Sequence, residues 1–232
     1  MSSIVERLSR CAAPLEYNNF MSPEDLRREY TIAGLTETDA GDDPFVLFGT
    51  WFHAAMSAHI HDPNAMTLAT TSADGMPSAR VVLLKQFDHQ GFCFFTNYNS
   101  RKAQDLEFNP NCCLVFFWQT LERQIRIEGR AIRTSASESD HYFASRPRGS
   151  RLGALASPQS AVVASRVELD KRLIELEDQY PDDNIPRPEF WGGYRVVPRV
   201  FEFWQGRPNR LHDRLRFTRE QDNSWRRERL GP

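Results

Sequence analysis

The chain has 232 residues, a formal net charge of −2, 40% hydrophobic residues and 26% charged residues. This length suits one large domain or two small ones, and the near-zero charge disfavours a nucleic-acid-binding protein that relies on a positive field. No apolar run approaches the ~20 residues that a membrane helix needs, and residues 1–20 lack the apolar block of a secretory signal. We therefore expect a cytoplasmic globular protein with no nucleic-acid partner and no membrane partner.

Residues 1–25 are expected to form a mobile N-terminal arm, and residues 26–232 are expected to form one domain. Ser22-Pro23-Glu24 has the cap and the first-turn proline of a short helix that would run to Tyr30. Residues 34–41 are typical of a linker. Asp43-Pro44 then begins a firmer helix to residue 60, whose apolar face repeats at helical spacing through Phe48, Trp51, Phe52, Ala55 and Met56.

From residue 65 the pattern changes from helical to extended. Apolar and β-branched runs separated by turn signals predict strands over residues 66–71, 78–84, 92–96, 112–119, 123–134, 194–197, 200–204, 214–218 and 224–229. Shorter helices are expected over residues 100–109, 137–145 and 169–180. Many short strands with few scattered helices predict a mainly β protein, an antiparallel barrel carrying helices, and argue against a parallel doubly wound sheet.

The cysteines and histidines offer little support for a metal site. The four cysteines, Cys11, Cys93, Cys112 and Cys113, form no C-x-x-C pair, and three of them lie inside apolar runs, so buried thiols are expected. His59-Ile60-His61-Asp62 lies at the end of a predicted helix, where histidine favours the helix dipole, and no further ligands follow at usable spacing. We therefore expect no metal.

Cations at strand ends and helix starts are the first candidates for an anion site. The sequence has no G-x-G-x-x-G and no G-x-x-x-x-G-K-S/T, which excludes the usual dinucleotide and triphosphate loops. Arg80 and Lys85 instead bracket an apolar strand, and Ser100-Arg101-Lys102 opens a helix, whose free N–H groups favour an anion. The alternative is that Arg101 and Lys102 are solvated surface charges.

A second basic cluster contains Tyr142, Arg146, Arg148, Ser150 and Arg151. Tyr142 and Arg146 share one face of a predicted helix at i, i+4 spacing. A phenol, a guanidinium and a serine hydroxyl suit a phosphate monoester. The alternative is a basic helix end that favours its own dipole.

A third cluster lies near the C-terminus, where Glu202-Phe203-Trp204-Gln205-Gly206 precedes Arg210-Leu211-His212-Asp213-Arg214. Trp204 could stack on a planar ring or fill the core. Arg210 and His212 alternate, so an extended chain would present both on one side. A histidine near neutral pH beside an arginine can hold or move a proton, and a hydrogen-bonded structural histidine is the alternative.

Taken in order and at this spacing, these clusters resemble the pyridoxine 5'-phosphate oxidase (pyridoxamine 5'-phosphate oxidase) family from residue 26 to residue 232. The segments that carry the resemblance are Leu26-Arg27-Arg28-Glu29-Tyr30, residues 80–85, Phe95-Thr96-Asn97, Ser100-Arg101-Lys102, Leu121-Glu122-Arg123-Gln124, Ser145-Arg146-Pro147-Arg148, Gln159-Ser160, Phe190-Trp191-Gly192-Gly193, residues 202–206 and residues 210–214. The resemblance implies a split β-barrel homodimer with a C-terminal dimerisation region and with FMN bound between the subunits.

Position by position, the resemblance assigns the following contacts. Those implied for FMN are Arg80, Val81, Val82, Leu83, Leu84, Lys85, Phe95, Thr96, Arg101, Lys102, Gln124, Gln159, Ser160, Trp204 and Arg214. Those implied for the substrate are Arg27, Arg28, Glu29, Tyr30, Lys85, Tyr142, Arg146, Ser150, Arg210, Leu211 and His212. Residues 27–30 would cover the site, the phosphate would meet Lys85, Tyr142, Arg146 and Ser150, and Arg210 and His212 would be the catalytic residues.

The implied reaction oxidises pyridoxine 5'-phosphate and pyridoxamine 5'-phosphate to pyridoxal 5'-phosphate, with dioxygen reoxidising the flavin and yielding hydrogen peroxide. This chain departs from the family pattern at Phe95, Arg151 and Pro158, where tyrosine, glutamine and a basic residue are common. Two alternatives stay open. One is a dihydrophenazine oxidase on the same fold, and the other is a non-catalytic carrier of flavin or pyridoxal phosphate.

Overall fold

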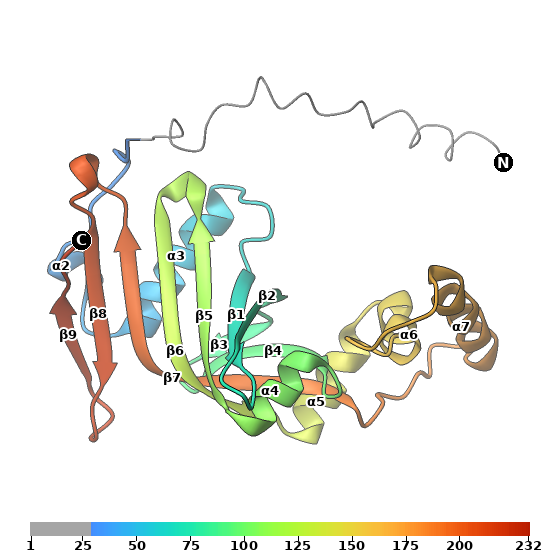
Figure 1. Ribbon diagram of the computed structural model, residues 1–232. Helices are drawn as coiled ribbons and strands as arrows, with labels where there is room; N and C mark the ends of the chain where they lie inside the picture. Colours follow the sequence, from blue (N-terminus) through green and yellow to red (C-terminus); the bar gives the residue numbers. More distant parts are fainter. Residues whose placement is uncertain (1–28) are drawn as a thin grey trace, which may run out of the picture.

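The computed structural model describes residues 29–232, which form one curled antiparallel sheet of nine strands with helices at its edges (Figure 1). The strands are β1 (Ala65–Thr71), β2 (Pro77–Leu83), β3 (Gln86–Asp88), β4 (Gly91–Asn97), β5 (Asn111–Trp118), β6 (Arg123–Arg133), β7 (Trp191–Gln205), β8 (Asp213–Arg219) and β9 (Trp225–Arg229). Among these residues, no helix is long and apolar enough to cross a membrane.

The helices lie outside this sheet or across its face. They are α2 (Glu37–Ala40), α3 (Pro44–Ser57), α4 (Arg101–Phe108), α5 (Ala136–Ser145), α6 (Arg148–Ala156) and α7 (Arg166–Gln179), with single 3₁₀ turns η3 (Gln119–Leu121) and η4 (Pro208–Arg210). In Figure 1, α6 and α7 form an arm that projects from one end of the sheet, and β8 and β9 lie at the opposite end.

The long strand β7 connects the two ends of the sheet. The strand order is β2-β1-β5-β6-β7-β4-β3, with β8 also paired to β7 and β9 paired to β8. The first part of β7 pairs with β4, and its last part, from Val200 to Gln205, pairs with β8. Between these parts the β6–β7 register shifts next to Gly129, whose partner is Pro198. A Cβ at Gly129 would lie 2.4 Å from the Val197 carbonyl oxygen, so only glycine fits this close approach.

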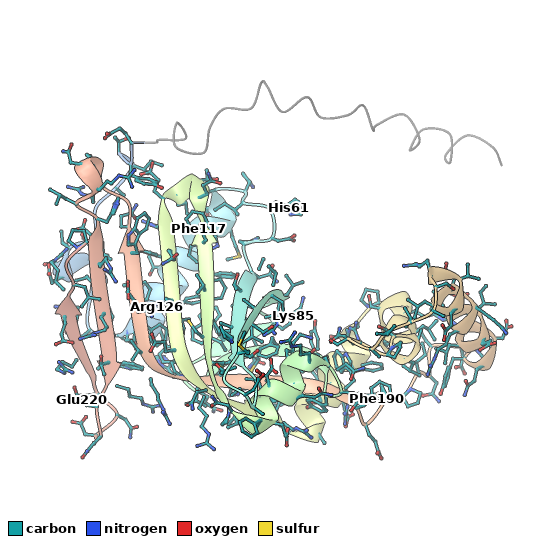
Figure 2. All side chains as sticks on the ribbon, in the orientation of Figure 1. His61, Lys85, Phe117, Arg126, Phe190 and Glu220 are labelled. Carbon is teal, nitrogen blue, oxygen red and sulfur yellow. The ribbon has the colours of Figure 1, made fainter. Side chains whose placement is uncertain are left out.

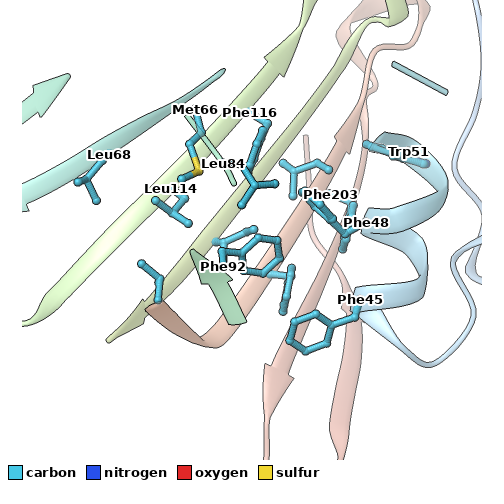
Figure 3. Close-up of a cluster of buried hydrophobic side chains, with 14 of the residues drawn as sticks. Phe45, Phe48, Trp51, Met66, Leu68, Leu84, Phe92, Leu114, Phe116 and Phe203 are labelled. Carbon is cyan, nitrogen blue, oxygen red and sulfur yellow. The ribbon is translucent and has the colours of Figure 1, made fainter. Parts of the chain in front are cut away.

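The hydrophobic core lies between α3 and the concave face of the sheet (Figure 3). Asp43 caps α3 by accepting a hydrogen bond from the Phe45 N–H, and Pro44 occupies the first turn. Phe48 is fully buried and packs edge-on against Phe92 and Phe116, with ring centroids 4.8 and 5.2 Å apart. Burying such aromatic rings supplies most of the driving force that curls the sheet around the helix.

Most of the expected strands are confirmed, and so is the mainly β architecture with helices. The expected break between residues 197 and 200 is wrong, because β7 runs through Pro198 as one strand. The expected linker over residues 34–41 is also wrong, because Thr36 and Asp39 form a capping box that starts α2. Helix α6 and strand β3 were not expected.

The expected arm over residues 1–25 and the expected helix start at Ser22 lie outside the described residues, as do Cys11, Arg27 and Arg28. The expectation for the other cysteines is confirmed for Cys93 and Cys112, which are buried, while Cys113 is half-buried. Burial raises the pKa of the Cys93 thiol to about 11 and that of Cys112 to about 12, so both stay protonated at neutral pH.

Candidate functional site

A cavity of about 470 Å³ brings together residues from the first and second basic clusters. It lies where the ends of β2 and β4 meet α4, α5 and α6, and Figure 2 labels Lys85 on this side of the sheet, facing the helical arm. The lining residues are Val81, Val82, Leu83, Lys85, Phe95, Thr96, Lys102, Tyr142, Arg146, Pro147, Ser150, Gln159 and Trp191. Residues 81–85, 95–102 and 142–150 therefore meet at one site with Gln159 and Trp191.

Lys102 is the best-anchored cation in this cavity. Its Nζ donates to Thr96 Oγ1 at 3.1 Å, to Ser100 Oγ at 3.2 Å and to Gln159 Oε1 at 2.8 Å. Burial, and secondarily the charge of Arg80, lowers the pKa of Lys102 to about 8. All three partners are neutral, so the ammonium keeps its charge available for an anion. Ser100 is the N-cap residue of α4, and its Oγ donates to the Asn97 carbonyl oxygen at 2.6 Å and makes no side-chain cap bond.

Arg146 provides the clearest sign of a missing anionic partner. Its guanidinium lies 4.7 Å from the centroid of the Trp191 ring, a cation–π contact that holds the side chain in place. The Nη1 atom is buried without a hydrogen-bond partner among the described residues, and burial lowers the pKa of this group. A buried N–H donor without an acceptor costs about 1–3 kcal/mol, more when charged. An anion bound in the cavity would supply that acceptor.

The aromatic wall of the cavity consists of Phe95, Tyr142 and Trp191. Phe95 stacks on Tyr142 with ring centroids 3.9 Å apart and on Trp191 at 5.6 Å. Gly193 permits this packing, since a Cβ there would lie 2.8 Å from the Phe95 ring. The hydroxyl that tyrosine would add at position 95 is therefore not required for the stack. Trp191 was not among the expected site residues, although the sequence motif Phe190-Trp191-Gly192-Gly193 marks it.

Several expected residues lie beside this cavity and do not line it. Arg80 donates to Thr70 Oγ1 at 2.6 Å and to Ser78 Oγ at 2.7 Å. Arg101 and Ser160 line an adjacent cavity of about 530 Å³, and Gln159 lines both cavities. Leu84 is buried in the core below β2.

The basic cluster on α5 and α6 divides into two groups. Arg146 and Ser150 face the cavity, whereas Arg148 donates to the Tyr180 carbonyl oxygen. Arg151 donates to the Asp183 carbonyl oxygen at 2.8 Å and pairs with the Asp183 carboxylate at 2.9 Å. Arg151 therefore holds the arm together and does not reach the anion site. Pro158 lines the adjacent cavity.

The third cluster forms a separate group at the far end of β7. Gln124, Trp204 and Arg214 lie side by side in register on β6, β7 and β8. Arg214 Nε donates to Glu202 Oε1 at 2.9 Å, and Arg126 Nη2 donates to Glu202 Oε2 at 2.5 Å. These two cations lower the pKa of the buried Glu202 carboxyl despite its desolvation. This paired carboxylate fixes the side chain of Arg214.

Three rings meet over this group. The Tyr30 ring lies edge-on to Trp204 and to His212, with centroids 5.6 and 5.5 Å apart, and the Trp204 and His212 rings are 4.7 Å apart. A Cβ at Gly206 would lie 2.8 Å from the Tyr30 side chain, so the bare glycine backbone seats this ring. Glu29 is exposed.

His212 is held in one protonation form. Its Nδ1 accepts a hydrogen bond from the Arg207 backbone N–H at 3.1 Å, so the neutral ring carries its proton on Nε2. Burial, and secondarily the charge of Arg210, lowers the pKa of His212, which favours this neutral form. Neutral His212 is therefore a hydrogen-bond donor through Nε2.

The expectation that an extended chain presents Arg210 and His212 on one side is wrong. Arg210 ends the 3₁₀ turn η4, and Asn209 and Arg210 have φ angles of 56° and 60°. Left-handed backbone at a non-glycine residue costs of order 1–3 kcal/mol and is found preferentially at functional sites. Arg210 and Leu211 are exposed on this turn, whereas His212 is half-buried.

The two groups do not meet within one chain. Gly192 pairs with Thr96 at the cavity, and Trp204 lies twelve residues farther along the same strand. At roughly 3.3 Å per residue this is on the order of 40 Å measured along the curved strand. No described residue of the C-terminal group lines the 470 Å³ cavity.

Comparisons with known proteins agree with these features. Residues 52–180 match the family described as pyridoxamine 5'-phosphate oxidase, and residues 191–232 match the pyridoxine 5'-phosphate oxidase C-terminal dimerisation region. A Nostoc sp. protein named pyridoxine/pyridoxamine 5'-phosphate oxidase is 56% identical, covering 90% of this chain and 97% of that protein. A protein of the same name from Rubrobacter xylanophilus is 59% identical, covering 89% and 95%.

Solved structures give the same picture of the fold. PhzG from Burkholderia lata, in complex with tetrahydrophenazine-1-carboxylic acid, is 32% identical with a TM-score of 0.81, covering 86% of this chain and 98% of that chain. An FMN-binding protein from Nostoc punctiforme, related to pyridoxamine 5'-phosphate oxidase, has a TM-score of 0.65 at 17% identity, covering 82% and 98%. The expected split barrel is thus confirmed, and the chain belongs to the pyridoxamine 5'-phosphate oxidase family.

Proposed function

We propose that this protein is an FMN-dependent oxidase that converts pyridoxine 5'-phosphate and pyridoxamine 5'-phosphate to pyridoxal 5'-phosphate. Dioxygen is the final oxidant and hydrogen peroxide is released. The observation that carries the proposal is the buried Nη1 of Arg146, which has no hydrogen-bond partner among the described residues and belongs to a guanidinium held over Trp191. Lys85, Tyr142 and Ser150 line the same cavity. This donor set suits a phosphate monoester. A cytoplasmic location stays a prediction from the sequence.

The cavity has the groups that FMN requires. Lys102, Thr96 and Gln159 form one hydrogen-bonded set, and β2 presents Val81, Val82 and Leu83 beside it. From the partner, Gln124, Trp204 and Arg214 would complete the flavin contacts. FMN held by these residues would supply the acceptor for the hydride equivalent of the substrate 4′-carbon.

The protein's own residues orient the substrate and handle its charge. Arg146, Lys85, Tyr142 and Ser150 hold the phosphate, and Arg210 clamps the pyridine ring with its rigid, permanently charged fork. Because Nδ1 of His212 accepts from the Arg207 N–H, the Nε2–H of the neutral ring would be the donor to the substrate. Water would then take the proton of the 4′ hydroxyl or amino group. The Tyr30 ring lies over Trp204 and His212, where it would exclude water from the reacting atoms.

A dihydrophenazine oxidase is the alternative substrate class, because PhzG shares this fold. A carboxylate would engage a bidentate arginine but would leave other donors of this cavity unused. Peroxide release should therefore be measured with each phosphorylated vitamer, with the unphosphorylated vitamers and with a dihydrophenazine carboxylate. We expect rapid release with the phosphorylated vitamers alone. Turnover of the phenazine and not of the vitamers would refute the proposal.

The bound flavin should be FMN. Lys102 lines the cavity, Arg80 and Arg101 lie beside it, and the sequence lacks an adenosine-binding fingerprint. We expect the purified protein to be yellow and to release FMN on denaturation, identified by chromatography of the supernatant. Release of FAD, or failure to take up FMN on reconstitution, would contradict this assignment.

The active form should be a homodimer in which each site draws on both chains. Residues 191–232 match a dimerisation region. Lys102 of α4 contacts Thr96, which pairs with the first part of β7, whereas Trp204 lies near the other end of β7. Lys102→Met and Trp204→Ala should each inactivate the enzyme. Mixing the two variants under conditions of subunit exchange should restore about a quarter of the parental activity, because half of the dimers then carry one intact site.

Two results would contradict the shared site. One is a monomeric mass by light scattering in the presence of FMN. The other is the absence of any recovered activity although subunit exchange is demonstrated with differently tagged chains, since contacts from a single chain cannot be restored by mixing.

A further inference from the structure

The segment that leads to Tyr30, residues 29–41, is held by an ion-pair network on the C-terminal hairpin of β8 and β9. Arg229 binds both Glu37 carboxylate oxygens, Nε at 2.7 Å and Nη2 at 2.9 Å. Its Nη1 binds Asp213 Oδ1 at 2.7 Å, and Nη2 also donates to the Leu35 carbonyl oxygen at 3.0 Å. One guanidinium thus contacts the segment and the hairpin at four points. The hydrogen bond from Arg229 lowers the pKa of Glu37 to about 2, so Glu37 stays ionised.

The backbone of the same segment is fixed at neighbouring points. The Leu35 N–H donates to Asp213 Oδ2 at 3.0 Å, and the Ile32 N–H donates to Glu122 Oε2 at 3.1 Å. Arg207 Nη1 donates to the Ala33 carbonyl oxygen at 3.4 Å. Leu35 is 2% exposed, so its side chain also anchors the segment in the core. The path of the chain is therefore determined within two residues of Tyr30.

The position of the Tyr30 ring follows from this anchoring. The ring rests on Gly206 and contacts Trp204 and His212. Asp213 directly follows His212 in the chain and also binds Leu35 and Arg229. Asp213 therefore connects the turn that carries Arg210 and His212 to residues 29–41. Exposed ion pairs contribute little to stability, whereas a contact that sets the position of a covering ring can affect the reaction strongly.

We propose that Asp213 and Arg229 are positioning residues that hold Tyr30 over Trp204 and His212. They act on the reaction through Tyr30 and do not touch the substrate. The proposal rests on the proposed oxidase function. It predicts that loss of the Arg229 network loosens residues 29–41 and misplaces Tyr30, while the barrel and the phosphate cavity stay intact.

The test compares Arg229→Met with Arg226→Met in the FMN-loaded enzyme. Arg226 lies on the same strand, and among residues 29–232 it pairs only with Glu220 and Glu228 of the hairpin, so it is a matched control. Arg229→Met should raise hydrogen exchange over residues 29–41 and slow flavin reduction by pyridoxamine 5'-phosphate about tenfold. Arg226→Met should change neither. Glu37→Gln removes the charge of the Glu37–Arg229 ion pair at an exposed residue, and it should also raise exchange and slow flavin reduction. This second variant keeps the proposal testable if Arg229→Met fails to fold.

A double-mutant cycle separates positioning from plain stabilisation. In a Tyr30→Ala background, Arg229→Met should slow flavin reduction by less than about twofold, because the residue through which it acts is already lost. Full additivity of the two substitutions would overturn the proposal, as would unchanged exchange over residues 29–41. If the parental enzyme is not reduced by the substrate, the proposed oxidase function fails instead, and the exchange comparison alone then decides whether Arg229 holds the segment.

Discussion

Arg210→Met should slow reduction of the flavin by pyridoxamine 5'-phosphate about 100-fold, measured anaerobically by stopped flow. Arg210 is exposed on the turn after β7, at a φ angle of 60°, and makes no ion pair with another described residue. The planar, permanently charged guanidinium of Arg210 is thus available on a strained turn to hold a substrate ring in place. Losing a positioning contact can cost on the order of 100-fold in rate even when binding survives.

The comparison with His212→Asn sharpens this prediction. His212 is a donor through Nε2 and water can take the released proton, so this variant should lose less activity than Arg210→Met. Reoxidation by dioxygen should be nearly unchanged in both variants, because it follows substrate oxidation. Reduction of the Arg210→Met flavin at the parental rate would show that Arg210 is not a catalytic residue.

Arg146→Met should raise the KM for both phosphorylated substrates strongly. Charge-assisted hydrogen bonds contribute about 1.5–3 kcal/mol each, which corresponds to roughly 10- to 150-fold in affinity. Methionine keeps an unbranched apolar side chain but removes the hydrogen-bond donors and the cation–π contact with Trp191. The value of kcat should change less, since the phosphate lies away from the reacting carbon.

Arg148→Met is the control for this experiment, because Arg148 lies two residues away and binds the Tyr180 carbonyl oxygen outside the cavity. Unphosphorylated pyridoxine should be a poor substrate of the parental enzyme, and Arg146→Met should leave its turnover unchanged. Equal turnover of pyridoxine and its phosphate by the parental enzyme would contradict the assignment of this cavity to a phosphate.

The strands could be predicted from the sequence because alternation and turn signals are local. The break expected within β7 shows the limit of that reasoning. Proline lacks an N–H and disfavours a central strand, so Pro198 signals an interruption. In the folded chain Pro198 stands opposite Gly129 at the register shift, where the ladder is already irregular. Pro198 is therefore tolerated because of Gly129, almost seventy positions away, and the sequence around Pro198 cannot reveal this.

Helix α6 was missed for a related reason. Pro147, Gly149 and Gly153 are weak helix formers, and the local signals favour a loop. Pro147 instead stands at the N-cap, where its missing N–H costs nothing. Leu152 is fully buried in a cluster with Phe143, Ile185 and Trp191. Tertiary burial therefore outweighs local propensity here. The turn at Arg210 is similar, because alternation in the sequence could not reveal two successive left-handed residues.

The residues of the candidate site could be predicted from the sequence, but their positions relative to one another could not. The motifs identified Lys85, Tyr142, Arg146 and Ser150, and the structure gathers these four around one cavity. The sequence could not show that Trp204 and Arg214 lie at the other end of β7, since that distance depends on how the strand pairs. The sequence also could not show that Arg151 forms an ion pair with Asp183 and does not reach the cavity.

The central claim is that this chain, loaded with FMN, oxidises the 4′-carbon of a phosphorylated vitamer. The most direct test is an anaerobic single turnover, in which the FMN-loaded enzyme is mixed with pyridoxamine 5'-phosphate and the flavin and product absorbances are followed together. We predict that the flavin bleaches and that one pyridoxal 5'-phosphate forms per flavin reduced, with colour returning when dioxygen is admitted. A flavin that stays oxidised with saturating pyridoxamine 5'-phosphate and with pyridoxine 5'-phosphate would contradict the claim.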